Sequence, residues 1–257
     1  MNETVEKPNT PSVEQRVDEW IKLDEVALKY HQLQWETPKQ STKFLEQFAS
    51  GKLKSARKVL DLGCGAGAAT AYFASQHPNV LFSGKDYVDE LVELGNELAL
   101  KRGIGNLDFQ QADWFDLEEE SFDGVLSLQT LSWLPEYQRP LKEIFTKIKP
   151  NWICLNSLFY DGEISCRIEV KEYARAAQSF YNVYSIPDVS RFCANHGYRL
   201  TEAQPFVLDI DIPKPKNPDI MGTYTVNAIG SNGSLERMQI SGPLMLSWYM
   251  IIIERVE

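Results

Sequence analysis

Hydrophobic and polar residues follow one another in two alternating rhythms along most of this chain. Short, largely apolar runs predict buried strands, and between them lie longer segments whose apolar residues recur at helical spacing. The predicted strands are residues 59–62, 80–85, 107–111, 123–128, 152–158, 198–212 and 244–254. The predicted helices between them are residues 66–76, 88–102, 136–147 and 187–195. Strands that alternate with helices indicate an α/β fold with a doubly wound, mostly parallel sheet.

Three segments fall outside this rhythm. Residues 1–55 are expected to form an N-terminal helical cap, of which residues 1–12 are polar, contain two prolines and are expected to be disordered. Residues 159–185 are rich in aromatic side chains, and residues 213–243 contain a Gly-Ser-Asn-Gly sequence typical of a hairpin turn. We therefore divide the chain into the cap and one domain, residues 56–257, which carries these two insertions.

Composition narrows the classes of protein to be considered. The chain has 257 residues, of which 43% are hydrophobic, enough for one sizeable core. Its net charge is −10 and it has no dense basic tract, so a nucleic-acid partner is not expected. Its four cysteines lack the spacing of a metal site, and such usage fits a reducing cytoplasm. No apolar run suits a signal peptide or a membrane span, so a soluble, cytoplasmic protein without a metal is expected.

A glycine-rich sequence at residues 59–70, Val-Leu-Asp-Leu-Gly-Cys-Gly-Ala-Gly-Ala-Ala-Thr, carries the strongest functional signal. Gly63, Gly65 and Gly67 let the backbone turn sharply from strand to helix and approach a ligand with no Cβ in the way. Asp61 lies near the carboxyl end of the strand, where open parallel sheets bind their ligands. A carboxylate there disfavours a phosphate and suits an amine or a hydroxyl. The pattern therefore favours a nucleoside that carries a cationic tail.

Two other interpretations of these glycines stay open on the residues alone. Gly63, Gly65 and Ala68 also fit the G-x-G-x-x-G/A fingerprint of nicotinamide and flavin enzymes. That loop holds a pyrophosphate at a helix N-terminus, where Asp61 would be unfavourable. The second alternative is a glycine turn with a purely structural role.

The acid-x-Gly-x-Gly-x-Gly pattern from Asp61 to Gly67 resembles motif I of the class I S-adenosylmethionine-dependent methyltransferases. The resemblance covers roughly residues 39–209 and the terminal strand, and it implies a seven-stranded sheet whose last strand is antiparallel. It also implies S-adenosylmethionine as the cofactor. Asp86, 19 residues after Gly67, would accept hydrogen bonds from both ribose hydroxyls, with Tyr87 beside the adenine. The alternative role for Asp86 is to cap the following helix.

Further cofactor residues are expected at the ends of the next two strands. Asp113 resembles the residue that accepts the adenine amino group, with Trp114 covering the ring, and the alternative is an acid in a surface turn. After the fourth strand, Gln129 is expected near the methionine moiety and Trp133 at the acceptor side. This stretch lacks the Asn-Pro-Pro-Tyr motif of DNA and glutamine methyltransferases, which argues against methylation of an amide or an exocyclic amine by their mechanism.

The residue that would remove a proton from the acceptor is not fixed by spacing. His31 lies in the N-terminal segment that often covers the cofactor in this family, and it is a candidate base or acceptor ligand. The alternative is that His31 is a residue of the N-terminal cap and has neither role. Tyr30 and Trp35 are expected to close over the methionine end. Asp161, after the fifth strand, is a second candidate base, and its alternative is a solvated turn.

The acceptor is expected to be a small polar molecule, methylated on an oxygen such as that of a sugar or another hydroxyl compound. Tyrosines of the first insertion and polar residues of the second are the candidate acceptor contacts: Tyr160, Tyr181, Tyr184, Tyr224 and Arg237. Packing onto the N-terminal helices is the alternative for the first insertion, and pairing of two subunits into a homodimer for the second. The alternative functions are a non-catalytic S-adenosylmethionine-binding module and a nicotinamide-dependent oxidoreductase.

Overall fold

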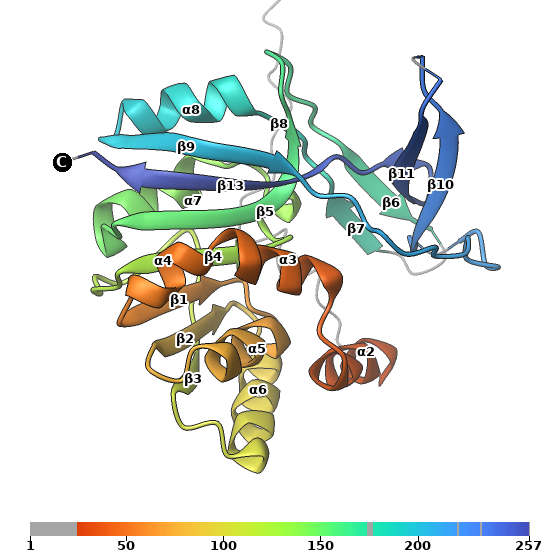
Figure 1. Ribbon diagram of the computed structural model, residues 1–257. Helices are drawn as coiled ribbons and strands as arrows, with labels where there is room; N and C mark the ends of the chain where they lie inside the picture. The colour runs from red at the N-terminus through yellow and green to blue at the C-terminus, as the bar shows by residue number, and fades with distance from the viewer. Residues whose placement is uncertain (1–24, 174–176, 220, 232, 257) are drawn as a thin grey trace, which may run out of the picture.

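An eight-stranded sheet forms the centre of the molecule (Figure 1). The computed structural model describes residues 25–173, 177–219, 221–231 and 233–256, so residues 1–12, for which disorder is expected, lie outside it. Seven strands follow the order β3-β2-β1-β4-β5-β13-β9, and the short strand β8 pairs with the end of β5. The strands are β1 (Lys58–Leu62), β2 (Leu81–Asp86), β3 (Leu107–Gln111), β4 (Gly124–Leu128), β5 (Trp152–Tyr160), β8 (Tyr184–Ser185), β9 (Tyr198–Pro205) and β13 (Trp248–Arg255).

Strand directions confirm the predicted fold class. From β3 to β5 every neighbouring pair is parallel, whereas β13 runs antiparallel to both β5 and β9. The last two strands are shorter than predicted, because residues 206–212 leave the sheet and residues 244–245 pair with residues 240–241 instead. The Phe206 N–H still donates to the Trp248 carbonyl at 2.8 Å, and the Leu208 N–H then donates to the Gln239 side chain at 3.2 Å. The chain thereby passes from the sheet to the second insertion.

Helices cover both faces of this sheet. One layer contains α3 (Gln40–Phe48), α4 (Ser50–Ser55), α5 (Ala68–Gln76) and α6 (Asp89–Arg102). The other contains α7 (Gln138–Glu143), the π-helical turn η2 (Ile144–Ile148) and α8 (Ile186–Ala194). Two buried clusters fill the space between the layers and the sheet, one around Phe73 and Val59 and the other around Ile144 and Ile153. The single helix predicted over residues 136–147 is therefore two shorter elements in succession.

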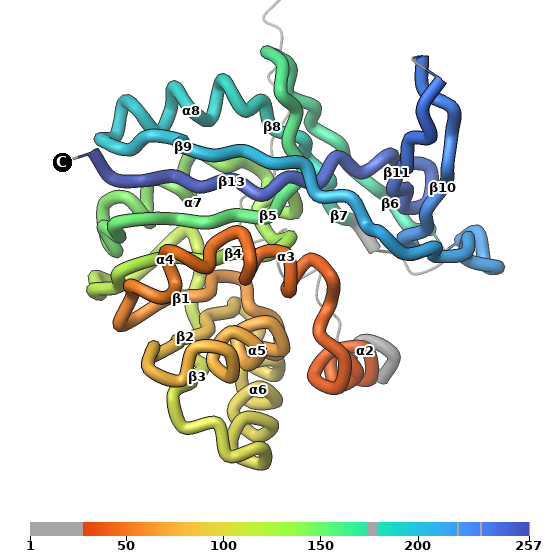
Figure 2. Tube along the Cα trace, in the orientation of Figure 1, coloured from red at the N-terminus to blue at the C-terminus, as the bar shows by residue number. Residues whose placement is uncertain are grey.

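The N-terminal segment divides into two parts. Leu45 of α3 and Leu53 of α4 are buried in the core cluster around Phe73, so these helices belong to the layer on the sheet. The preceding helix, α2 (Glu25–Glu36), packs against α5, and the chain passes from it through α3 to the sheet (Figure 2). Of the described helices in this segment, it is α2 that reaches the glycine-rich turn.

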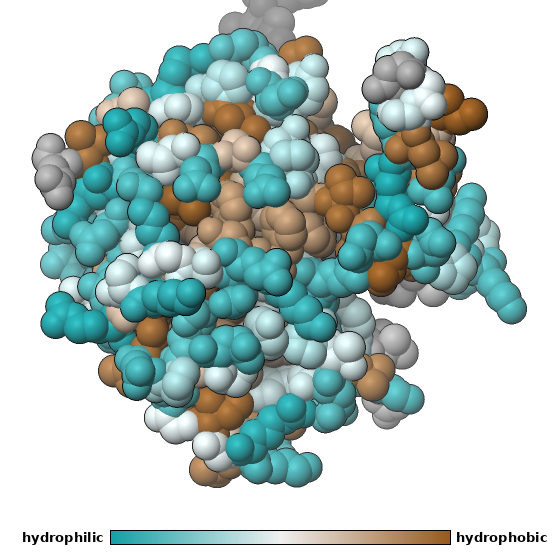
Figure 3. All heavy atoms as spheres, viewed as in Figure 1, coloured by the Kyte–Doolittle hydropathy of each residue, from teal (hydrophilic) through white to brown (hydrophobic). Residues whose placement is uncertain are grey.

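Both insertions form antiparallel hairpins. The first contains β6 (Glu169–Glu172) and β7 (Ala177–Phe180). The second contains β10 (Thr223–Ile229) and β11 (Leu235–Ser241), which form the hairpin predicted from the sequence, and the short β12 (Leu244–Met245) directly after the insertion pairs with β11. The second hairpin stands away from the sheet in Figure 1 and carries hydrophobic residues at its surface in Figure 3.

Candidate active site

The glycine-rich turn joins β1 to α5 and brings three separate elements together. Gly63, Gly65 and Gly67 have φ angles of 69°, 58° and 78°, in the left-handed region that favours glycine. A Cβ at Gly63 would overlap the Thr130 side chain, and one at Gly67 would overlap the ring of Phe109. These two glycines are therefore needed for packing within the domain. Gly65 differs, because its nearest neighbour is a side chain of α2.

Asp61 is buried beneath this turn, and among the described residues only one of its two carboxylate oxygens has a hydrogen-bond partner. Its Oδ2 accepts a hydrogen bond from the Thr70 hydroxyl of α5 at 2.7 Å. Its Oδ1 is buried and has no hydrogen-bond partner among the described residues. Burial and, to a smaller extent, the nearby Asp86 carboxylate raise the pKa of Asp61 to about 7, against the opposing effect of the Thr70 hydrogen bond. A buried acceptor without a donor is costly, so this oxygen suits the N–H groups of a ligand.

Asp86 ties the same turn to the end of β2. Its Oδ2 accepts from the Gly65 N–H at 2.7 Å, and its Oδ1 accepts from the Val88 N–H at 3.1 Å. Burial raises the pKa of Asp86, and the hydrogen bonds from the backbone oppose that shift. The structure thus places both acids at the glycine turn. Tyr87, next along the chain, is exposed.

At the end of β3 the two expected adenine residues differ in burial. Asp113 is half-buried, and its Oδ1 accepts from the Phe115 N–H at 2.9 Å in a tight turn. Trp114 is 4% exposed and packs in the core cluster around Ile144. Trp114 is thus a core residue of this face, and its expected role of covering the adenine ring stays a prediction.

The end of β4 carries an unusual backbone conformation beside the glycine turn. Gln129 has a φ of 59°, a conformation that non-glycine residues adopt rarely, and its N–H donates to the Asn156 carbonyl at 2.7 Å. The next residue, Thr130, donates from its hydroxyl to the Gly63 carbonyl at 3.1 Å. Strained residues of this kind cluster at functional sites. The role of Thr130 in fixing the turn was not visible from the sequence.

Helix α2 places an imidazole directly on the glycine turn. The Cε1 atom of His31 lies 3.2 Å from the position of a Cβ on Gly65. The neighbouring Tyr30 ring is exposed and stands edge-on to the imidazole, with 5.7 Å between ring centroids. Burial and the charge of Lys39 lower the pKa of His31 to about 4, so the ring is neutral at physiological pH.

Trp35, the third aromatic residue predicted in this segment, anchors α2 to the domain. Its indole N–H donates to the Ala66 carbonyl at 2.8 Å, and its ring packs edge-on against Phe109 at 6.4 Å. The Arg102 guanidinium lies 5.3 Å from the ring centroid. Trp35 is buried among these residues, and its expected place over the methionine end stays a prediction.

The acceptor side is built where the segment after β4 meets both insertions. The Trp133 and Tyr181 rings are 5.3 Å apart, and the Tyr181 hydroxyl is hydrogen-bonded to Ser241 of β11. Asn182 holds this junction together: its N–H donates to the Ser132 carbonyl at 2.9 Å, and its side-chain amide donates to the Leu134 carbonyl at 2.8 Å. The sequence did not predict this role of Asn182, because a single asparagine in an aromatic-rich segment forms no recognisable motif.

Three of the residues predicted to contact the acceptor instead make contacts within the protein. Tyr184 is buried in the core, and its hydroxyl donates to the Leu134 carbonyl at 3.2 Å, so the expectation that it contacts an acceptor is wrong. Tyr224 is buried under the Lys214 ammonium, 5.6 Å from its ring centroid. Arg237 forms an ion pair with Asp211 at 2.6 Å. The structure does not bring these three side chains to the glycine turn.

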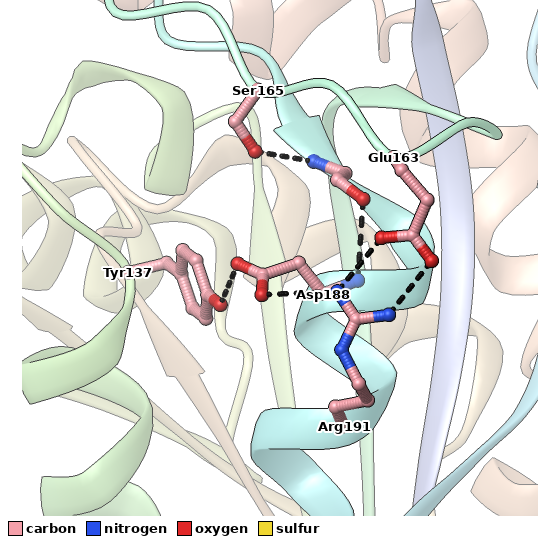
Figure 4. Close-up of polar contacts among 6 residues, drawn as sticks. Tyr137, Glu163, Ser165, Asp188 and Arg191 are labelled. Atoms are coloured by element: carbon pink, nitrogen blue, oxygen red, sulfur yellow. Dashed lines mark hydrogen bonds and ion pairs between the residues drawn. The ribbon is translucent and has the colours of Figure 1, made fainter.

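The turn that follows β5 is exposed. Asp161 and Tyr160 are both exposed there. Glu163, two residues after Asp161, forms a bidentate ion pair with Arg191 of α8, with both N–O distances 2.8 Å (Figure 4). Asp188 of the same helix accepts from the Tyr137 hydroxyl at 2.7 Å. Glu163 thus attaches the segment after β5 to α8, and Asp161 lies in a solvated turn.

The groups at the glycine turn fit a nucleoside with an amino group. Asp61 offers a buried oxygen without a donor, and Asp86 offers a carboxylate at the neighbouring strand end. Within the described residues, no cluster of three or more His, Cys, Asp or Glu side chains is arranged to hold a metal ion. Likewise, no described helix is long and apolar enough to cross a membrane.

Comparison with known proteins identifies the family. A methyltransferase-domain model matches residues 53–193. A trans-aconitate 2-methyltransferase of Rhodococcus jostii is 30% identical over 113 residues, 44% of this chain and 42% of that protein. A release factor glutamine methyltransferase of Aliivibrio fischeri is 38% identical over 93 residues, 35% of this chain and 33% of that protein. The chain thus spans less than half the length of these relatives.

The fold agrees with this match. The structure of a 1,6-didemethyltoxoflavin-N1-methyltransferase from Burkholderia thailandensis, with bound 1,6-didemethyltoxoflavin and S-adenosylhomocysteine, superimposes with a TM-score of 0.56. The sequences are 17% identical, and the superposition covers 90% of this chain and 85% of that one. Since the family model covers more than half of the chain and its sheet has the expected order, the chain belongs to the class I S-adenosylmethionine-dependent methyltransferases.

Proposed function

We propose that this protein transfers a methyl group from S-adenosylmethionine to a small polar acceptor, and that the acceptor atom is an oxygen. The observation that carries the proposal is the unpartnered, buried oxygen of Asp61 beneath the glycine turn of the family's own motif. The name of one relative, a trans-aconitate 2-methyltransferase, supports a small polar acceptor. No nucleic acid is proposed as a partner. Assembly into a homodimer and a cytoplasmic location stay predictions.

Each group at the turn has a distinct role in this proposal. S-adenosylmethionine, when bound, supplies a methyl group that its positive sulfur has already activated. Asp61 would accept from the ligand's ammonium and Asp86 from its ribose hydroxyls. Tyr87 and Asp113 would contact the adenine, and Gln129 the methionine end. The task left to the chain is to align the acceptor and exclude water.

On the acceptor side, the Trp133 and Tyr181 pair would form one wall. Burial raises the pKa of the Tyr181 hydroxyl, and Tyr30 of α2 adds a small contribution to that rise. We therefore propose that residues 1–55 contribute α2 as the cap over the site, and that Tyr160 borders the acceptor from the end of β5.

The properties of the two candidate bases narrow the choice of chemical class for the acceptor. An effective general base has a pKa near the working pH, and the pKa of His31 is about 4. His31 is therefore a weak base, and Asp161 lies in an exposed turn. An oxygen that is already ionised at neutral pH needs no base. A carboxylic acid thus fits these residues better than a sugar or another hydroxyl compound.

Replacement of Asp86 tests the cofactor site directly. Asp86→Ala is expected to weaken S-adenosylhomocysteine binding about tenfold or more, because two hydrogen bonds to a carboxylate are lost. Isothermal titration calorimetry measures this, with Asp89→Ala, an exposed acid at the start of α6, as the matched control. Heat with NADH and none with S-adenosylhomocysteine would instead support a nicotinamide-dependent oxidoreductase.

Turnover separates an enzyme from a non-catalytic binding module. Radiolabelled methyl transfer is measured with trans-aconitate, other small carboxylic acids, sugars and amines. We expect incorporation with a carboxylic acid. A protein that binds the cofactor but labels none of these acceptors would favour the binding module.

A further inference from the structure

The second hairpin and β12 carry an apolar face that is partly open to solvent. Side chains alternate between the two faces of a sheet, and residues paired across strands share a face. One face of β10, β11 and β12 therefore carries five apolar residues: Val226, Ala228, Met238, Ile240 and Met245. Val226 is 36% and Met245 is 66% exposed, and the other three are half-buried. Figure 3 shows hydrophobic residues at the surface of this hairpin, which stands away from the central sheet in Figure 1.

The opposite face of the hairpin already has a partner within the chain. The Gln239 side chain donates to the Phe206 carbonyl at 2.9 Å and accepts from the Leu208 N–H at 3.2 Å. Arg237, on the same face as Gln239, forms an ion pair with Asp211 at 2.6 Å. These contacts attach the hairpin to the segment after β9, so the apolar face points away from that segment. A contiguous apolar face at a protein surface is typical of a contact with another macromolecule.

Two charges without ion-pair partners lie at opposite ends of the apolar face. Lys214 lies over the ring of Tyr224, with 5.6 Å between its Nζ atom and the ring centroid, and Tyr224 is two residues before Val226 on this face. Glu236 is paired with Ala228 at the other end of the face. Neither Lys214 nor Glu236 forms an ion pair with another residue of the described ranges. The face therefore has a positive end, an apolar middle and a negative end.

We propose that this face is the contact surface of a homodimer in which two hairpins pack face to face. The two-fold axis would run across the strands at the level of Val226 and Met238. It reverses the direction of the partner's strands, so the positive end of each face meets the negative end of the other. Both charges are then paired, and the apolar middle is removed from water. An axis along the strands would instead bring like charges together, which is unfavourable.

A second copy of the chain is the occupant because the face is complementary to itself. Its size limits the strength of the dimer. β10 and β11 have seven residues each. The face is therefore about 24 Å long and about 10 Å wide, smaller than the roughly 800 Å² per partner of a stable interface. The net charge of −10 on each chain adds repulsion. We expect a concentration-dependent dimer with a dissociation constant in the micromolar range, and no ligand is needed for it.

Sedimentation velocity of the full-length protein between about 1 and about 200 µM measures the association. Val226→Glu places a carboxylate in the apolar middle, and Met245→Glu places one at its edge, in case the first variant does not fold. Leu100→Glu is the matched control, because Leu100 lies on α6 and is 84% exposed. Lys214→Glu, Glu236→Lys and their combination test the charge pairing.

The unmodified protein is expected to pass from monomer to dimer as its concentration rises. Val226→Glu should weaken the dimer about a hundredfold or more, because the new carboxylate would lose its water without gaining a partner. Leu100→Glu should leave the dimer unchanged. Each single charge reversal should weaken it about tenfold, since like charges then meet twice, once on each side of the axis. The combined reversal should restore most of the affinity.

The proposal is wrong if the unmodified protein stays monomeric over the whole range, or if neither Val226→Glu nor Met245→Glu alters its dimer. A dimer that Val226→Glu disrupts but that the combined charge reversal does not restore would contradict the two-fold arrangement. Species larger than a dimer would also contradict it, because a two-fold contact is closed.

Discussion

Asp61→Asn is expected to weaken S-adenosylhomocysteine binding about tenfold or more while making the ligand-free protein more stable at pH 8. The asparagine oxygen can still accept from the Thr70 hydroxyl, so the local packing is kept. The negative charge that a bound ammonium needs is lost. In the ligand-free protein the same change removes a buried charge, and the free energy of unfolding should rise by roughly 1–3 kcal/mol. Calorimetry and urea unfolding measure the two effects.

The pH dependence follows from the raised pKa of Asp61. In the unfolded chain Asp61 ionises near its ordinary value of 3.8, and in the folded protein only near 7. Between these pH values the folded state holds the proton more tightly, so this group's contribution to stability falls as the pH rises from about 4 to 7. Ligand binding requires the ionised form, so affinity should fall as the pH drops below about 7. The difference between the unmodified protein and Asp61→Asn isolates both trends from the other acids.

Asp123 provides a control, because its pKa is shifted in the opposite direction to that of Asp61. Its carboxylate accepts from the Arg57 and Lys58 N–H groups at 2.7 and 3.0 Å, and these bonds lower its pKa. A lowered pKa gives stability that is present above the unfolded value and is lost as the pH falls. Asp123→Asn should therefore destabilise the protein at pH 8 without changing ligand affinity. If Asp61→Asn behaved like Asp123→Asn in stability, the burial argument for Asp61 would be refuted.

Much of the fold could be predicted because local and global signals agree. The alternation of strands and helices predicted the central sheet, and the helix predicted over residues 88–102 is observed as α6, which Gly103 ends in the left-handed conformation. The boundaries were harder. The helix predicted over residues 136–147 changes to a π-helical turn at Ile144, and a hydrophobic pattern does not distinguish these two kinds of turn.

The candidate site was predictable only where a motif marks it. Asp61 and Asp86 follow from the spacing of the glycines, and the structure places both at the turn. Aromatic residues were less informative, because a tryptophan or tyrosine suits a core and a pocket equally well. Trp114 and Tyr184 are core residues, whereas Trp133 is partly exposed. The sequence could not separate them, since burial depends on how distant segments pack.

Contacts between segments that are distant in the sequence could not be predicted for the same reason. Thr130 binds the Gly63 carbonyl across 67 residues of sequence, and Asn182 joins Leu134 across 48.

Gly67→Ala is expected to cause the largest loss of stability. Gly67 has a φ of 78°, and a Cβ there would overlap the ring of Phe109, which is buried between α5 and α6. The left-handed backbone costs roughly 1–2 kcal/mol for alanine, and overpacking of a core adds about 1–3 kcal/mol. Gly103→Ala is the matched control, because Gly103 has a φ of 66° and nothing within 4 Å of its Cβ position. Urea unfolding should show a loss for Gly67→Ala about two to three times that for Gly103→Ala.

A second variant separates the overlap from the backbone strain. Phe109→Leu shortens the ring that faces Gly67, so the double variant should lose less stability than the two single losses added together. If Gly67→Ala does not fold, the double variant still reports whether the shorter side chain restores folding. A loss for Gly67→Ala no larger than that for Gly103→Ala would show that Phe109 does not constrain the turn. The glycine at position 67 would then serve the ligand and not the core, as its place in the motif alone suggests.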